Sequence, residues 1–253
     1  MEQKKSFNRI HLIDEIRGFA IICMVVYHTF YDLVAIFGVN ISFFFSPFME
    51  KLVTSFVFLF VFISGTASNF SRSNLIRGLK CFGLGLIMTL FTFFFMKSQL
   101  IVFGILHMLG ACMMLYSLLD FLLKKIHPVA LIIGSILLYA FTYNVVNGYL
   151  GFENFLMIPL PHSLYQFGYL FPLGFVSPTF YSADYFALFP WLFCFIAGSG
   201  FGRLIQQNKL PKFIYLSHCK PIAFVGRHTL IVYILHQPIV YSILWIIFYF
   251  INQ

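Results

Sequence analysis

Long apolar runs alternate with short polar stretches along the whole chain. An α-helix rises 1.5 Å per residue, so about 20 apolar residues cross a hydrocarbon core roughly 30 Å thick. Seven runs approach or reach this length: residues 18–37, 51–68, 79–96, 100–123, 128–147, 185–204 and 228–250. The pattern predicts an all-α polytopic membrane protein, a bundle of about seven transmembrane helices or slightly more.

One connection departs from this pattern. Residues 148–184, between the fifth and sixth runs, are rich in Pro, Gly, Tyr and Phe. They hold too many helix breakers for a spanning helix and too many apolar side chains for a segment in water. Because Tyr suits the level of the lipid headgroups, we expect an aromatic, proline-rich lid or re-entrant element at the outer interface.

Composition supports the membrane assignment. The chain is 60% hydrophobic and 9% charged, which leaves too little polar surface for a soluble globule. No soluble segment interrupts it, so residues 1–253 are expected to form a single transmembrane domain. No internal repeat is found, which disfavours a transporter built from inverted repeats.

The basic residues predict an orientation, because Lys and Arg are retained on the cytoplasmic side. With a cytoplasmic N-terminus, only Lys51 and Lys97 of the 16 basic residues fall outside. The C-terminus is then outside, and the net charge of +8 reflects topology and not a nucleic-acid partner. The short, loop-poor chain is expected in a bacterial plasma (inner) membrane.

Polar residues inside the first run are candidates for chemistry. Arg17 and His28 are eleven residues apart, roughly 16 Å along a helix, so Arg17 lies near the cytoplasmic face and His28 near mid-bilayer. Asp32 is one turn further on the same face, where its carboxylate can accept an imidazole N–H and fix the tautomer. An oriented, neutral histidine suits a general base. The alternative is a buried histidine that a polar neighbour satisfies.

Two further histidines occupy comparable depth. His107 lies in the fourth run, and His236 lies in the last run just before Pro238, which frees backbone groups of a helix. With His28 they could converge on one cavity. No acidic or cysteine ligand has a matching spacing, so no metal is expected.

Residues at the two ends of the runs are candidates for binding. Arginine suits phosphate groups, and four arginines at cytoplasmic helix ends could line a pocket for a phosphate-bearing donor: Arg17, Arg72, Arg77 and Arg227. Each is also a plain topology anchor. On the outer side, His162, Asp184 and Trp191 are candidates for contact with a substrate.

Several blocks resemble one family. They are IDEIRGFAIICMVVYH, FVFISGTAS, FGILHMLG, YSADYFALFPWLFCFIAG and GRHTLIVYILHQPI, and they lie between residue 9 and about residue 243. Together they resemble the heparan-alpha-glucosaminide N-acetyltransferase-like family of transmembrane acyltransferases. The family's opening histidine falls on His28 and its late histidine on His236.

The resemblance implies an acyl-CoA-dependent N- or O-acetyltransferase. Acetyl-CoA on the cytoplasmic side would donate to an amine or hydroxyl of a saccharide or envelope acceptor outside. The lysosomal branch has asparagine where His28 stands and a loop histidine that residues 37–54 lack, so the general base is expected at His28. Oriented by Asp32, His28 would deprotonate the acceptor while His236 or His107 binds the thioester oxygen.

Other interpretations stay open at this point. An acyl-histidine intermediate is the alternative route. A transporter or channel could use the histidines as a proton relay, and a structural envelope protein would use none of them. A homodimer is neither required nor excluded.

Overall fold

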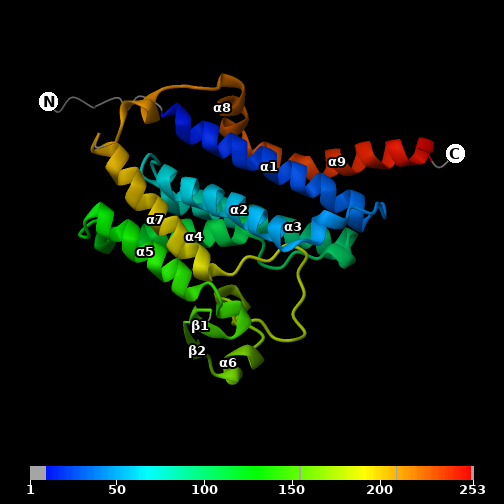
Figure 1. The fold of residues 1–253 in the computed structure, drawn as a ribbon, viewed down its shortest axis with the longest axis horizontal. Helices are drawn as coiled ribbons and strands as arrows, with labels where there is room; N and C mark the ends of the chain where they lie inside the picture. The colour runs from blue at the N-terminus through cyan, green and yellow to red at the C-terminus, as the bar shows by residue number, and fades with distance from the viewer. Residues whose placement is uncertain (1–9, 154, 209, 252–253) are drawn as a thin grey trace. The chain divides into compact units, whose positions relative to one another are not determined.

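The expected spans are helices in a computed structural model that describes residues 10–153, 155–208 and 210–251. Within these residues, seven helices are long and apolar enough to cross a membrane. They are α1 (His11–Ala35), α2 (Pro47–Ser68), α3 (Asn74–Phe95), α4 (Ile105–Leu123), α5 (Pro128–Thr142), α7 (Leu188–Gln206) and α9 (Thr229–Ile251). The predicted all-α polytopic fold is confirmed (Figure 1). Of the basic residues, Lys4, Lys5, Arg9 and Lys209 lie outside the described ranges.

The chain forms two compact units. The terminal unit comprises Met1–Ile63 and Leu210–Gln253, and the central unit comprises Ser64–Lys209. That they act as one transmembrane domain stays a prediction. Short elements complete both units: η1 (Ser42–Phe45), η2 (Lys97–Gln99), η3 (Val145–Asn147), η4 (Phe171–Leu173), η5 (Lys212–Tyr215), α6 (His162–Gln166) and α8 (Lys220–Arg227).

Close glycine contacts organise the terminal unit. A Cβ at Gly18 would collide with the carbonyl of Ile222, and a Cβ at Gly226 with the carbonyl of Asp14. The missing side chains therefore let α8 lie directly on α1. The last helix, α9, follows α8 at once and packs along α1 (Figure 1). This sets the level at which side chains of α9 meet those of α1.

The central unit is built from two antiparallel pairs, α3 with α4 and α5 with α7, which meet through α4 and α7. The side chain of Arg203 donates to the carbonyls of Leu123 (2.9 Å) and Ile126 (2.9 Å). It thereby satisfies acceptors at the end of α4 that have no partner within the helix. Thr66 donates across to the carbonyl of Gly198 at 3.0 Å, so a polar link also joins α2 and α7.

The Pro- and Gly-rich connection has secondary structure of its own, which the sequence pattern did not predict. After η3, strands β1 (Tyr149–Phe152) and β2 (Leu156–Pro159) pair antiparallel with Leu150 opposite Ile158. The strand pair lies beyond the C-terminal end of α5, with α6 next to it (Figure 1). The short strands carry no long periodic pattern. That this connection serves as an outer lid stays a prediction.

Candidate functional site

Two of the predicted histidines meet inside the terminal unit. The ring centroids of His28 on α1 and His236 on α9 are 5.0 Å apart, with 53° between the ring planes. Tyr27 lies edge-on to His28 at 5.5 Å. The structure thus brings together this pair, which comes from the first and last spans of the chain, and one cavity shared by all three histidines stays a prediction.

His236 has a defined tautomer. Its Nδ1 lies 2.6 Å from the carbonyl oxygen of Tyr233. A carbonyl oxygen only accepts, so Nδ1 carries the hydrogen and the neutral ring keeps its lone pair on Nε2. That Nε2 atom is buried and has no hydrogen-bond partner. His236 is therefore oriented as a proton acceptor.

Asp32 has a different partner from the one expected. The residue is fully buried, and its Oδ1 accepts a hydrogen bond of 2.7 Å from Nε2 of Gln237 on α9. Its Oδ2 has no partner. The predicted hydrogen bond from His28 to Asp32 is wrong, because α9 brings the Gln237 amide against the carboxylate while the His28 ring lies against His236. Sequence reasoning missed Gln237, although a polar side chain beside His236 inside an apolar run was a usable signal.

The open hydrogen-bonding atoms of this cluster share one property. Besides Asp32 Oδ2 and His236 Nε2, the Oε1 atom of Gln237 is buried without a partner. A carboxylate oxygen, an amide oxygen and a deprotonated imidazole nitrogen are all acceptors. Each of these three atoms can therefore accept a hydrogen bond from an N–H or O–H donor.

The third predicted histidine belongs to the central unit. His107 is buried, with Nε2 at 3.4 Å from the hydroxyl of Thr89 and its ring against Phe82 and Phe103. A Cβ at Gly85 would lie 2.8 Å from its Nδ1, so glycine makes room for the ring. Its Nδ1 atom is buried without a hydrogen-bond partner, and its role in a shared site stays a prediction.

The outer candidates also have structural partners in the central unit. The Asp184 carboxylate accepts from the backbone N–H of Ile105 at 3.1 Å and so caps the start of α4. Trp191 is buried against Tyr139, with ring centroids 5.6 Å apart. His162 is exposed at the first residue of α6. Contact between these residues and a substrate stays a prediction.

The four arginines divide between the units. In the terminal unit, Arg17 pairs with Asp14 at 3.5 Å and Arg227 lies over the ring of Phe224 at 5.7 Å. Arg72 and Arg77 are exposed residues of the central unit. One pocket shared by all four stays a prediction.

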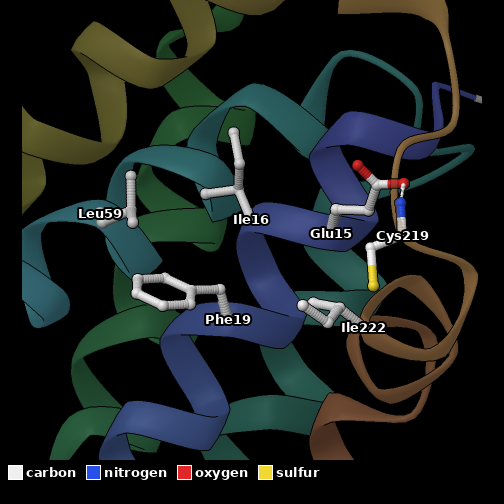
Figure 2. A pocket seen from close by; sticks show the side chains of 6 residues that line it. All are labelled: Glu15, Ile16, Phe19, Leu59, Cys219 and Ile222. Carbon is white, nitrogen blue, oxygen red and sulfur yellow. Dashed lines mark hydrogen bonds between the residues drawn. The ribbon is translucent and has the colours of Figure 1, made fainter.

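A cavity of about 290 Å³ lies between α1, α2 and the start of α8 (Figure 2). Its lining is almost wholly apolar: Glu15, Ile16, Phe19, Leu59, Cys219 and Ile222. Glu15 Oε1 accepts from the backbone N–H groups of His218 (2.7 Å) and Cys219 (2.8 Å), which ties the chain before α8 to α1. Neither site histidine lines the cavity, and Phe19 precedes His28 by nine residues, about 13 Å of helix. The cavity is therefore distinct from the histidine pair.

Metal ligands are not grouped in the described part of the chain. No set of three or more His, Cys, Asp or Glu side chains there could hold a metal ion. The cluster of α1 and α9 combines one carboxylate, one amide and two imidazoles, which suits hydrogen bonding and proton transfer.

Seven apolar helices define a multi-pass membrane protein, and its first and last spans bring together one buried acid with an amide and two imidazoles that are partly buried. The family model for heparan-alpha-glucosaminide N-acetyltransferase, catalytic, matches residues 9–238. The chain therefore belongs to this family, and the resemblance seen in the sequence is confirmed. Membership indicates a transmembrane acetyltransferase, and the family in general uses acetyl-CoA as its donor. No curated protein and no solved structure matches the chain.

Proposed function

We propose that the protein transfers an acetyl group from cytoplasmic acetyl-CoA to an amine of a saccharide on the far side of the membrane, an amino sugar or an envelope glycan. The membrane would be a bacterial plasma membrane, with the N-terminus inside and the C-terminus outside. The observation that carries the proposal is the cluster of the buried Asp32 with the partly buried His28, His236 and Gln237 in a chain of this family.

The open acceptors of the cluster favour an amine over a hydroxyl. An ammonium group brings three N–H donors and a positive charge, whereas a hydroxyl brings one donor. Asp32 Oδ2, Gln237 Oε1 and His236 Nε2 would receive these donors. A carboxylate in a low-dielectric site also attracts a cation strongly. N-acetylation therefore fits this site better than O-acetylation.

The proposed chemistry is a direct transfer. The bound ammonium first gives up one proton, for which Asp32 Oδ2 is an acceptor. The neutral amine nitrogen then attacks the thioester carbonyl carbon while His236 Nε2 takes a second proton from it. The carbon–sulfur bond breaks, and the proton on His236 passes to the CoA sulfur, giving the amide and CoA thiol. His28 would donate to the developing oxyanion. The sequence led us to expect His28 as the general base and His236 as the oxyanion donor. The proposal exchanges these two roles, because the hydrogen bond at Nδ1 leaves Nε2 of His236 as a proton acceptor.

On the donor side, the terminal unit offers Arg17 and Arg227 for the phosphates of CoA. Both stand within a few residues of the contact between α1 and α8. Arginine binds phosphate through two parallel N–H donors, which a lysine does not reproduce.

The test uses purified protein with acetyl-CoA and a pair of sugars that differ in one group, glucosamine and glucose. We expect CoA thiol release and an acetylated product with glucosamine only, and a loss of more than a hundredfold in His236→Ala and in His28→Ala. His228→Ala, which removes an exposed histidine of the same unit, is the matched control and should keep full activity. Wild-type rates in both site variants would overturn the assignment. Solute flux without acetyl-CoA would instead favour a transporter.

A further inference from the structure

The hairpin of β1 and β2 is apolar on both of its faces. Every residue of β2 is exposed, and Phe155 in the turn is 87% exposed. Between Gly148 and Pro161 the only charged side chain is Glu153. A sheet that faces protein on one side and water on the other alternates apolar with polar residues. This hairpin does not alternate, so water does not fit either face.

Its position is fixed by the fifth span. That span runs to Asn147, and β1 begins two residues later, within roughly 7 Å of chain. The ring of Phe152 lies 6.4 Å from that of Phe141 on α5, and the N–H of Leu160 donates to the carbonyl of Gly148 at 2.9 Å. The hairpin is therefore held against the end of a membrane helix.

The apolar surface of β2 needs a cover. An isolated two-stranded hairpin is marginal in water, and an exposed apolar edge strand promotes aggregation. Within the described residues, no element buries β2. Tyr149 and Tyr169, of which Tyr169 is 71% exposed, are residues typical of the lipid headgroup level. A bilayer surface accepts apolar side chains from both faces at once, which a single protein surface does not.

We propose that the turn and β2, residues 155–158, insert their side chains into the interfacial layer of the leaflet in which α5 ends. The partner is the boundary between phospholipid headgroups and acyl chains. Insertion stops at this level, because the free N–H and C=O groups of the outer edge of β2 would be costly in the hydrocarbon core. This surface contact goes beyond the proposed acetyl transfer and does not depend on it.

Tryptophan fluorescence tests the insertion. The chain has two tryptophans, so the double variant Trp191→Phe, Trp245→Phe has no tryptophan fluorescence of its own. Leu156→Trp and Met157→Trp then place single reporters on opposite faces of β2, because neighbouring strand residues point to opposite sides. Each protein is reconstituted into phosphatidylcholine vesicles, some with lipids brominated near the headgroup end of the chain and some near its terminus.

We expect both reporters to be quenched at least twofold more by the shallow bromines than by the deep ones, and to be shielded several-fold from aqueous acrylamide. The protein that retains only Trp245, which is half-exposed on α9, is the positive control for lipid contact. Elution profile and helical content verify that each variant is folded. Quenching of one reporter alone would mean that one face packs on protein, and this result overturns the proposal. Strong acrylamide quenching of both, or shielding from both quenchers by a second copy, overturns it equally.

Discussion

Removal of the Gln237 amide tests the link between α1 and α9. In Gln237→Leu, the 2.7 Å hydrogen bond to Asp32 is lost and the fully buried carboxyl group keeps no partner on either oxygen. A hydrogen bond to a charged group contributes about 1.5–3 kcal/mol in proteins generally. Links between membrane helices average about 0.6 kcal/mol and reach about 1.7, because the unfolded chain in the membrane also finds partners. The short distance and complete burial place this bond at the upper end, about 1.5 kcal/mol.

The assay is unfolding of the purified protein in mixed micelles with increasing denaturing detergent. Gln237→Leu should lose about 1.5 kcal/mol, and Asp32→Leu a similar amount, since each leaves one buried polar group unpaired. The double variant should be more stable than the sum of the two losses predicts, because neither a buried carboxyl group nor a buried amide is then left without its partner. Asp32→Asn keeps an acceptor oxygen and should cost under about 1 kcal/mol. Strict additivity of the two leucine variants would refute the proposed link.

Three further predictions concern packing, pH and the donor. Gly226→Ala should destabilise the terminal unit by about 1–3 kcal/mol in the same unfolding assay because its methyl group meets the backbone of α1, whereas Gly83→Ala, with open space around it, should be neutral or stabilising. Burial raises the pKa of Tyr165 and the pKa of Tyr185 above the ordinary value of about 10. Their contribution to stability is therefore complete below pH of about 10 and is lost as the pH rises through the higher folded pKa values. Proteolysis of the connection between α5 and α7 should accelerate above pH of about 10, and should accelerate less in the double variant Tyr165→Phe, Tyr185→Phe. Arg17→Gln should raise the KM for acetyl-CoA by about tenfold or more through the loss of a charge-assisted hydrogen bond, and an unchanged KM would remove Arg17 from the donor site.

The sequence predicted those features that depend on local composition. The free energy of transferring an apolar run from water into the bilayer depends on the residues of that run alone, so all seven spans could be located without knowledge of their neighbours. The α8 helix, Lys220–Arg227, was missed because the prediction rested on long apolar runs, and a helix of eight residues is far shorter than a membrane span. The hairpin was missed for the same reason, since each strand has four residues.

The sequence predicted the histidines of the candidate site but did not predict their hydrogen-bond partners or that of Asp32. His28 and His236 stand out because imidazoles are rare inside apolar runs. The partner of Asp32 depends on which residue of α9 reaches α1, and that register follows from the contact of Gly18 with α8. The expectation of a His28–Asp32 pair used the helical spacing alone. Spacing defines which side chains share a face, whereas the neighbouring helix decides which of them pair.

The first helix brings three polar contacts of the terminal unit onto one rigid element. Glu15 holds the chain that leads into α8, Arg17 pairs with Asp14, and Asp32 receives the amide of α9. The contacts of Glu15 and of Arg17 with Asp14 lie within one turn of α1, and Asp32 is 17 residues beyond Glu15, about 25 Å along the helix. Because α8 leads directly into α9, the hydrogen bonds to Glu15 at the start of α8 and the hydrogen bond from Gln237 to Asp32 hold α9 against α1 at two levels. These two anchor points on α1 hold the backbone of α9, and the Tyr233 carbonyl holds Nδ1 of His236, so Nε2 keeps no hydrogen-bond partner and can exchange a proton.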